Sequence, residues 1–226
     1  MKVTLTFDNG PHPDVTPHVR QVLRAHGLHA HFFVVGEMVR KHGDELVATL
    51  DEGHRIGNHS NTHSTPLGLI PGPQGVAEVA LADEIIGKYC GDARAFRPFG
   101  GRGAVGPHLL SPSVWDYLSR NGYSCVLWNC LAYEWEDING WVEPTLERCR
   151  SQSHSVVVLH DLPSGAMLHL DRFIRSLRSE GAEFTLDFPV DCLPLSQGKA
   201  AWSSSALAGI VAHQSVAEQH VQETPE

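Results

Sequence analysis

The sequence predicts an α/β fold built around a parallel sheet. Short runs of β-forming residues alternate with helix-type runs about seven times along the chain, and the run SVVVLH at 155–160 is apolar almost throughout. Parallel strands need helical crossovers, and a strand covered by helices on both faces carries no polar alternation. A length of 226 residues with 42% hydrophobic content suits one domain or a compact pair. Either a doubly wound sheet or a barrel fits this pattern.

The first half of the chain contains four expected strands and three expected helices. The strands are Val3–Phe7, Ala30–Val35, Arg55–Asn58 and Ala93–Phe99, and the helices are Pro13–His26, 43–52 and Val76–Tyr89. Asp14 and Thr16 stand near the start of the first helix and Gly27 follows its end, as is typical of helix boundaries. The stretch 65–75 is rich in proline and glycine, which indicates a loop.

The second half continues the alternation. The expected elements are a helix at Ser111–Asn121, a strand at Tyr123–Asn129, a helix at Val142–Ser153, a strand at Ser155–His160, a helix at Ala166–Glu180 and a strand at Glu183–Phe188. Ser111 followed by Pro112 is a helix cap followed by proline at the first helical position. From about Ser196 the composition becomes small and polar. We therefore expect one domain over residues 1–195 and a C-terminal tail over 196–226, partly helical (205–221) or disordered.

Composition excludes several classes of function. The formal charge of −9 argues against a nucleic-acid partner, and no apolar run reaches the roughly 20 residues of a membrane helix. No signal-peptide pattern precedes the first strand, so a cytoplasmic location is expected. The five cysteines are odd in number and form no C-x-x-C pair, which favours buried, reduced thiols. No G-x-G-x-x-G follows the first strand, which argues against dinucleotide binding.

Five polar residues stand at or just past the carboxyl end of an expected strand: Asp8, His59, Arg97, Asn129 and His160. In α/β barrels this end of the strands carries the active site. One polar residue there is ordinary, but five that together offer acid, base and cation chemistry favour a catalytic site. An arginine at a strand end between two phenylalanines needs an anionic partner, for which Asp8 is a candidate. The alternative for His160 is a core histidine with satisfied hydrogen bonds.

The segment HSNTH places His59 and His63 four residues apart. On a helix or tight turn this spacing directs both imidazoles to one face, as in sites that hold zinc. The zinc-protease motif has a glutamate after the first histidine, where this chain has Ser60, so a metal site here must take its base from elsewhere. Two surface histidines, in a chain with 15 histidines, are the alternative interpretation. His12 is a spare candidate ligand, for which a surface role is the simpler interpretation.

The succession TFDNGP, HSNTH, FRPFGG, LWNCLAYEW and VVLHD resembles the polysaccharide deacetylases, also called NodB-homology proteins or family-four carbohydrate esterases. These motifs follow the family's order between Thr6 and Asp161. The resemblance implies a single-domain, distorted (β/α)7 barrel. It also implies a hydrolase that depends on a divalent metal, foremost Zn²⁺, and removes acetyl groups from an N-acetylated carbohydrate by cleaving a non-peptide C–N bond.

The resemblance assigns roles to individual residues. Asp8 matches the catalytic base, Arg97 the arginine that pairs with this base, and His160 the general acid. Glu134 stands where the family has the aspartate that tunes the acid histidine. The remaining matches are metal ligands and substrate-binding positions: Asn9, His59 and His63 for the metal, and Phe99, Gly100 and Trp135 for the substrate. Trp135 matches the tryptophan that walls the acetyl pocket.

Three positions depart from the family's pattern. Asn9 replaces the second aspartate of the first motif, which binds the metal in the family. Gly100 replaces an aromatic residue whose backbone N–H is thought to hold the oxyanion, and Leu131 replaces the first aspartate of D-x-x-D-W. These departures leave the expected fold unchanged and bear on metal affinity and on the identity of the substrate.

Asn9 leaves several possibilities for the metal. An amide oxygen can bind a divalent ion without contributing charge, so we expect weaker metal affinity but not the loss of catalysis, because three neutral ligands support zinc chemistry in carbonic anhydrase. Asp8 can instead ligate the ion, at the expense of its role as base. Deamidation at the Asn9-Gly10 sequence can also convert Asn9 to aspartate.

Two other functions fit the same residues. One is the hydrolysis of a small cytoplasmic amide or imide on the same fold, favoured by the absence of a signal-peptide pattern. The other is a metal-poor, sugar-binding pseudoenzyme. The presence of Asp8, Arg97, Glu134 and His160 argues against the second function, because binding alone needs no acid and base.

Overall fold

A parallel sheet forms the centre of the computed structural model, which describes residues 1–90 and 94–212. Its parallel strands are β1 (Lys2–Asp8), β2 (His31–Val34), β3 (Arg55–Asn58), β4 (Ala95–Phe96), β5 (Ser124–Cys125), β6 (Cys130–Leu131) and β7 (His154–His160). They lie in the order β5-β4-β3-β2-β1-β7-β6, with all neighbours in this series parallel. The α/β fold class expected from the sequence is confirmed.

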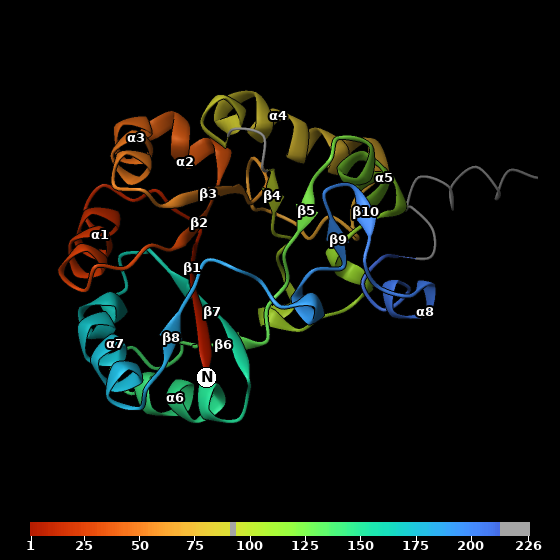
Figure 1. The fold of residues 1–226 in the computed structure, drawn as a ribbon. Coiled ribbons are helices and arrows are strands. Elements are labelled where there is room, and N and C mark those ends of the chain that lie inside the picture. Colours follow the sequence, from red (N-terminus) through yellow and green to blue (C-terminus); the bar gives the residue numbers. More distant parts are fainter. Residues whose placement is uncertain (91–93, 213–226) are drawn as a thin grey trace, which may run out of the picture.

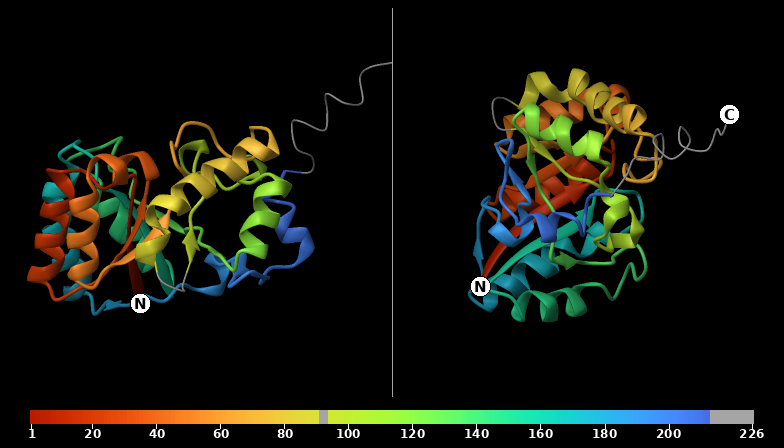
Figure 2. Two further views of the ribbon diagram at one scale, coloured as in Figure 1. Left: turned by 90° about the horizontal axis from the view of Figure 1, so that it is seen from above. Right: turned by 90° about the vertical axis from the view of Figure 1, so that its right-hand side faces the viewer.

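Helices cover the outside of this sheet (Figures 1 and 2). They are α1 (Val15–Ala25), α2 (Gly36–Lys41), α3 (Gly43–Asp51), α4 (Gly72–Cys90), α5 (Pro112–Arg120), α6 (Val142–Arg150) and α7 (Leu170–Ser179). Short 3-10 turns lie at Gly101–Gly103, Pro107–Leu109, Ala166–His169 and Val190–Cys192. The expected cap of α5 is present, because the Ser111 hydroxyl accepts a hydrogen bond from the Val114 N–H at 3.3 Å. Every helix within the described residues is too short or too polar to cross a bilayer.

The segment between α5 and α6 completes the barrel wall. The single strand expected at Tyr123–Asn129 is instead two short strands, β5 and β6, within one continuous segment. Cys125 in β5 pairs with Phe96 of β4, whereas Leu131 in β6 pairs with Val158 of β7. One stretch of chain therefore bridges the two edges of the sheet, which gives a barrel of seven parallel strands with a distorted closure.

Two apolar cores hold the helices to the strands. In one core β1, β2 and β7 pack against α1, α6 and α7, whose face of Leu170, Phe173, Ile174 and Leu177 is fully buried. In the other core α4 and α5 pack against β4 and β5. The described cysteines Cys125, Cys130, Cys149 and Cys192 are buried, as expected from the sequence.

The C-terminal residues add to the sheet beyond the expected boundary at residue 195. β8 (Glu183–Phe184) runs beside the start of β1, β9 (Leu195–Ser196) is antiparallel to β5, and β10 (Lys199–Ala200) is antiparallel to β9. The short helix α8 (Ser204–Leu207) follows. Ile210 is buried and Val211 forms a bridge with Leu110, because this otherwise polar stretch carries the apolar residues that cover the second core. Residues 213–221 of the expected tail helix lie outside the described residues.

Other differences concern the bounds of elements. α2 was not expected, because six residues are too few to display a helical period. α4 begins at Gly72 rather than Val76, since Pro73 in a first turn needs no N–H partner. The expected helix over Ala166–Glu180 is a 3-10 turn followed by α7.

Candidate active site

The strand register brings four of the five strand-end residues to one end of the barrel. Asp8 and His160 are direct partners at the ends of β1 and β7. Asn58 pairs with both Val34 and Phe96. His59 follows Asn58 and Arg97 follows Phe96, so His59 and Arg97 are also neighbours. Because parallel strands all end at the same edge, residues far apart in sequence gather around one cavity, as expected from the sequence.

Asn129 does not belong to this group. Its exposed side chain donates to the His154 carbonyl at 2.9 Å and accepts from the Val156 N–H at 2.8 Å, at the amino end of β7. The expectation that Asn129 stands at the carboxyl end of a strand is therefore wrong. β5 already ends at Cys125, and Asn129 comes directly before β6, which begins at Cys130.

Asp8 and Arg97 form a buried ion pair. The Arg97 Nη1 donates to Asp8 Oδ1 at 2.8 Å and to the Thr6 hydroxyl at 2.7 Å, and its side chain is fully buried. The guanidinium also lies over the ring of Phe33, 4.1 Å from its centroid. This confirms Asp8 as the anionic partner of Arg97. The ion pair fixes the orientation of the Asp8 carboxylate at the end of β1.

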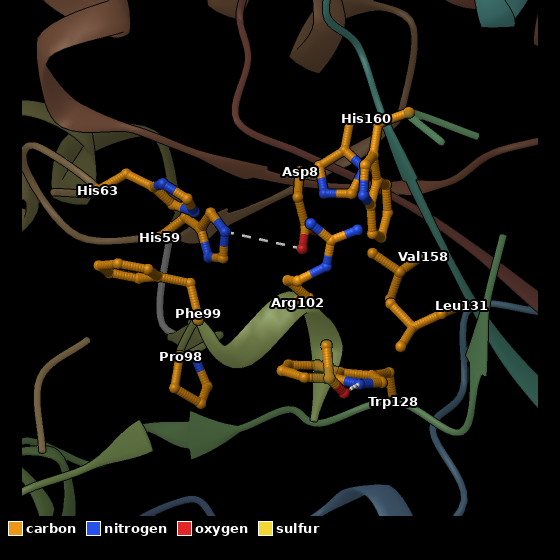
Figure 3. Close-up of a pocket in the computed structure, with 13 residues that line it drawn as sticks. Asp8, His59, His63, Pro98, Phe99, Arg102, Trp128, Leu131, Val158 and His160 are labelled. Atoms are coloured by element: carbon orange, nitrogen blue, oxygen red, sulfur yellow. Dashed lines mark hydrogen bonds and ion pairs between the residues drawn. The ribbon is translucent and has the colours of Figure 1, made fainter. Parts of the chain in front are cut away.

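His59 and His63 lie beside this carboxylate. The His59 Nδ1–H donates to the carbonyl of Arg97 at 2.8 Å, which leaves Nε2 unprotonated, 3.7 Å from Asp8 Oδ2 (dashed in Figure 3). The centroids of the two imidazole rings are 4.9 Å apart, and Phe99 stacks on His63 at 4.0 Å. Burial lowers the pKa of His59 to about 3 and also lowers the pKa of His63. Both histidines are therefore neutral near pH 7, which is the state that binds metal.

Asn9 follows Asp8 in a left-handed turn with φ of 77°. Its side-chain oxygen is buried and has no hydrogen-bond partner among the described residues. A buried oxygen without a partner is costly unless a cation or water satisfies it. Within residues 1–90 and 94–212 no group of three His, Cys, Asp or Glu side chains is placed to hold a metal, so the Asn9 amide is a candidate oxygen donor beside the two histidines. Two neutral imidazoles and an amide oxygen without a partner are donors that suit a divalent metal. All three are neutral, so they would not balance the charge of the ion.

His160 pairs with Glu134 on the opposite side of the cavity. Nδ1 of His160 donates to Glu134 Oε1 at 2.6 Å, and Glu134 is only 1% exposed. Trp135 meets the His160 ring edge-on at a centroid distance of 4.9 Å. Burial lowers the pKa of His160, but the hydrogen bond and the charge of Glu134 outweigh burial, so the pKa is raised above its usual value. This is the arrangement that a general acid requires near neutral pH.

These side chains line a pocket of about 170 Å³ (Figure 3). Its wall contains the expected Phe99, Gly100 and Trp135, together with six residues to which the sequence assigned no role: Pro98, Arg102, Gly103, Trp128, Leu131 and Val158. Trp128 and Leu131 belong to the closing segment, and Trp128 Nε1 donates to the Gly103 carbonyl at 2.9 Å. The sequence gives no sign that this segment divides into β5 and β6. The role of Trp128 and Leu131 in the pocket wall therefore could not be predicted.

Comparisons with known proteins agree with this geometry. The model of the family "Polysaccharide deacetylase" matches residues 1–126. A peptidoglycan-N-acetylglucosamine deacetylase of Bacillus cereus is 28% identical over 188 residues, which is 81% of this chain and 66% of the relative. A chitooligosaccharide deacetylase of Azorhizobium caulinodans is 29% identical over 164 residues, which is 70% of this chain and 73% of the relative.

Solved structures share the fold. A family-four acetyl xylan esterase of Clostridium thermocellum, in complex with a cobalt ion, is 27% identical with a TM-score of 0.65, and the match covers 82% of this chain and 87% of the esterase. A mutant of a pseudoenzyme of the same esterase family, described as having restored enzymatic activity, is 21% identical with a TM-score of 0.67. That match covers 81% of this chain and 64% of the pseudoenzyme, and at this identity it shows the fold alone. Because the family model spans residues 1–126 of 226, the chain belongs to the polysaccharide deacetylase family.

Proposed function

We propose that this protein is a metal-dependent hydrolase that removes the acetyl group from an N-acetylated sugar. One observation carries the proposal: a base paired with Arg97 and an acid paired with Glu134 face the same pocket from two adjacent strands. Amide hydrolysis needs both groups, because a water must lose a proton and the departing amine must gain one. Metal dependence is supported by the two neutral histidines and the orphan oxygen of Asn9 beside the base.

Asp8 acts as the base in this proposal. Its free oxygen takes the proton of the attacking water, while Arg97 holds the carboxylate in place. His160 then donates its Nε2 proton to the sugar nitrogen as the C–N bond breaks, and Glu134 stabilises the imidazolium beforehand. Phe99 and Gly100 line the pocket, and a backbone N–H from this segment would stabilise the negative charge that develops on the acetyl oxygen.

A divalent metal held by His59, His63 and Asn9 would act as a Lewis acid at the acetyl carbonyl. Zn²⁺ is our first choice, because two imidazoles and an oxygen donor suit it. The cobalt ion in the acetyl xylan esterase supports a divalent metal in general.

The wall of the pocket favours an acetyl group as the part of the substrate that enters. Trp128, Leu131, Trp135 and Val158 offer apolar surface beside the acid and base, and this suits a methyl group. The relatives are named for peptidoglycan and chitooligosaccharides, which both carry N-acetylglucosamine. Peptidoglycan, a shorter N-acetylated sugar and a small amide all carry the bond that this site would cleave, so each kind of substrate is tested.

The pseudoenzyme alternative rests on one observation. Asn9 gives the metal no charge, and within the described residues no three acidic, histidine or cysteine side chains could hold an ion. A protein that never retained metal would bind sugar without hydrolysing it. The intact pairs Asp8–Arg97 and His160–Glu134 favour catalysis over this alternative, because burying four charged groups has no purpose in sugar binding alone.

The proposal is tested by acetate release. Purified protein, stripped of metal and reloaded with Zn²⁺ or Co²⁺, should release acetate from N-acetylglucosamine oligomers or peptidoglycan fragments, and chelation should abolish the release. The same protein is assayed on a panel of small amides and imides, which tests the alternative function as a hydrolase of such compounds. Sugar binding without acetate release under every metal condition would instead support the pseudoenzyme.

The substitution Asn9→Asp should tighten metal binding. A carboxylate supplies the charge that the amide lacks, so we expect Zn²⁺ affinity to rise by about tenfold or more, with higher activity at limiting metal. Equilibrium dialysis against Zn²⁺ measures this change, and Asn9→Ala, which removes the oxygen, should weaken binding. Equal affinity of all three proteins would show that residue 9 does not contact the ion.

A further inference from the structure

Asp161 is a buried carboxylate that the proposed reaction does not use. It follows His160, and because side chains alternate along a strand, it faces away from the pocket toward α1. It is fully buried, and its Oδ2 accepts a hydrogen bond from the Thr16 hydroxyl at 2.5 Å. Its Oδ1 has no partner among the described residues. A buried carboxylate with so few partners is costly, which points to a role beyond packing.

The Asp161 carboxylate lies in close contact with the turn that follows β1. A Cβ atom at Gly10 would lie 2.2 to 2.6 Å from the atoms of the Asp161 carboxyl group, so only glycine allows this approach. The Thr16 hydroxyl that donates to Asp161 also accepts from the His12 N–H at 2.8 Å. Asp161 therefore holds the turn at two points, by direct contact at Gly10 and through Thr16 at His12.

This turn carries the proposed base, Asp8, and the proposed oxygen ligand of the metal, Asn9. Asp8 and Asn9 immediately precede Gly10, and the orphan oxygen of Asn9 lies on the same turn as the contact with Asp161. Burial raises the pKa of Asp161 to about 6, so the group is still ionised above neutral pH. A fixed negative charge in a water-poor interior acts over a longer range than one in solvent.

We propose that Asp161 is a positioning residue for the metal site. It fixes the Asn9–Gly10 turn so that the Asn9 oxygen faces the two histidines, and it supplies a nearby negative charge that a set of neutral ligands lacks. This inference rests on the proposed metal dependence. Groups that orient metal ligands in this way commonly change metal affinity by about 10- to 100-fold when they are removed.

The test is Zn²⁺ affinity, measured by competition with a chromogenic chelator, together with thermal unfolding of each metal-free protein. Asp161→Asn, which keeps the shape and removes the charge, should weaken Zn²⁺ binding by about tenfold or more. Thr16→Val should weaken binding in the same direction, and Thr16→Ser, which keeps the hydroxyl, should restore it. Asp83→Asn is the control, because Asp83 is a largely buried carboxylate on α4 that accepts from the Tyr123 hydroxyl and pairs with Arg94 away from the site.

The outcomes separate positioning from a merely structural role. Lower thermal stability of Asp161→Asn with unchanged Zn²⁺ affinity would overturn the inference, and Thr16→Val decides the question if Asp161→Asn does not fold. If the wild type binds Zn²⁺ too weakly to measure, the same series is made in Asn9→Asp, and absence of binding there would also overturn it. Acetate release is scored separately, so a protein that binds metal but hydrolyses nothing refutes the proposed function while leaving the role of Asp161 intact.

Discussion

His160→Ala should lower kcat by about 100-fold or more while the protein keeps its metal. The imidazole lines the pocket, and its Nδ1 is held by Glu134, which leaves Nε2 as the position from which His160 would donate a proton. Without an acid, the amine would have to leave as an anion. Steady-state kinetics on the substrate identified by acetate release, with metal content measured in the same samples, provides the test.

The pH profile provides an independent test of this acid. The pKa of His160 is raised above its usual value, so the protonated form persists below that pKa and is lost as pH rises through it. We therefore expect activity to fall on the alkaline side as His160 loses its proton. Glu134→Gln removes the charge that raises the pKa, so the alkaline limb should move to lower pH. An alkaline limb that stays in place in Glu134→Gln, or near-native turnover in His160→Ala, would show that another group is the acid.

His59→Ala and His63→Ala should each remove most of the bound metal. Each variant deletes one of two imidazole donors, which leaves the other imidazole and the neutral amide of Asn9, because the Asp8 carboxylate is paired with Arg97. Metal analysis after dialysis measures the loss. His63→Ala is the cleaner variant, because His59 is fully enclosed and its Nδ1–H holds the Arg97 carbonyl, so its removal also disturbs the base.

Matched controls distinguish loss of a ligand from loss of structure. His12→Ala removes a nearby histidine that contacts Thr16 only through its backbone, so its metal content should equal that of the wild type. Circular dichroism should show native helix content for His63→Ala. If both histidine variants retain metal, the ion binds elsewhere and the assignment of His59 and His63 is wrong.

The strand-end position of the polar residues was the most informative feature of the sequence. Parallel strands end at one edge, so the sequence alone predicts that four residues lie together: Asp8, His59, Arg97 and His160. The apolar strand β7 and the cap of α5 could also be predicted, because each depends on local sequence alone.

Features that depend on tertiary contacts could not be read in the same way. The strand expected to end at Asn129 is split because its first part pairs with β4 and its second with β7, and neither partner is local. Arg102 enters the pocket wall from a 3-10 turn with no periodic signal. The residues after 195 pack because a few apolar side chains find a distant core, although their average composition is that of a loose tail.

The central position of β1 bears on the order in which the chain can fold. This strand is synthesised before the other described strands, yet it pairs with β7 and β8, whose residues follow about 150 and about 180 positions later. Closing so long a loop is entropically costly, and folds dominated by such distant contacts form slowly. The base at the end of β1 therefore cannot meet the acid at the end of β7 until most of the chain has been synthesised. A nascent chain of this protein depends on late assembly, and its first apolar strand must be protected from aggregation until then.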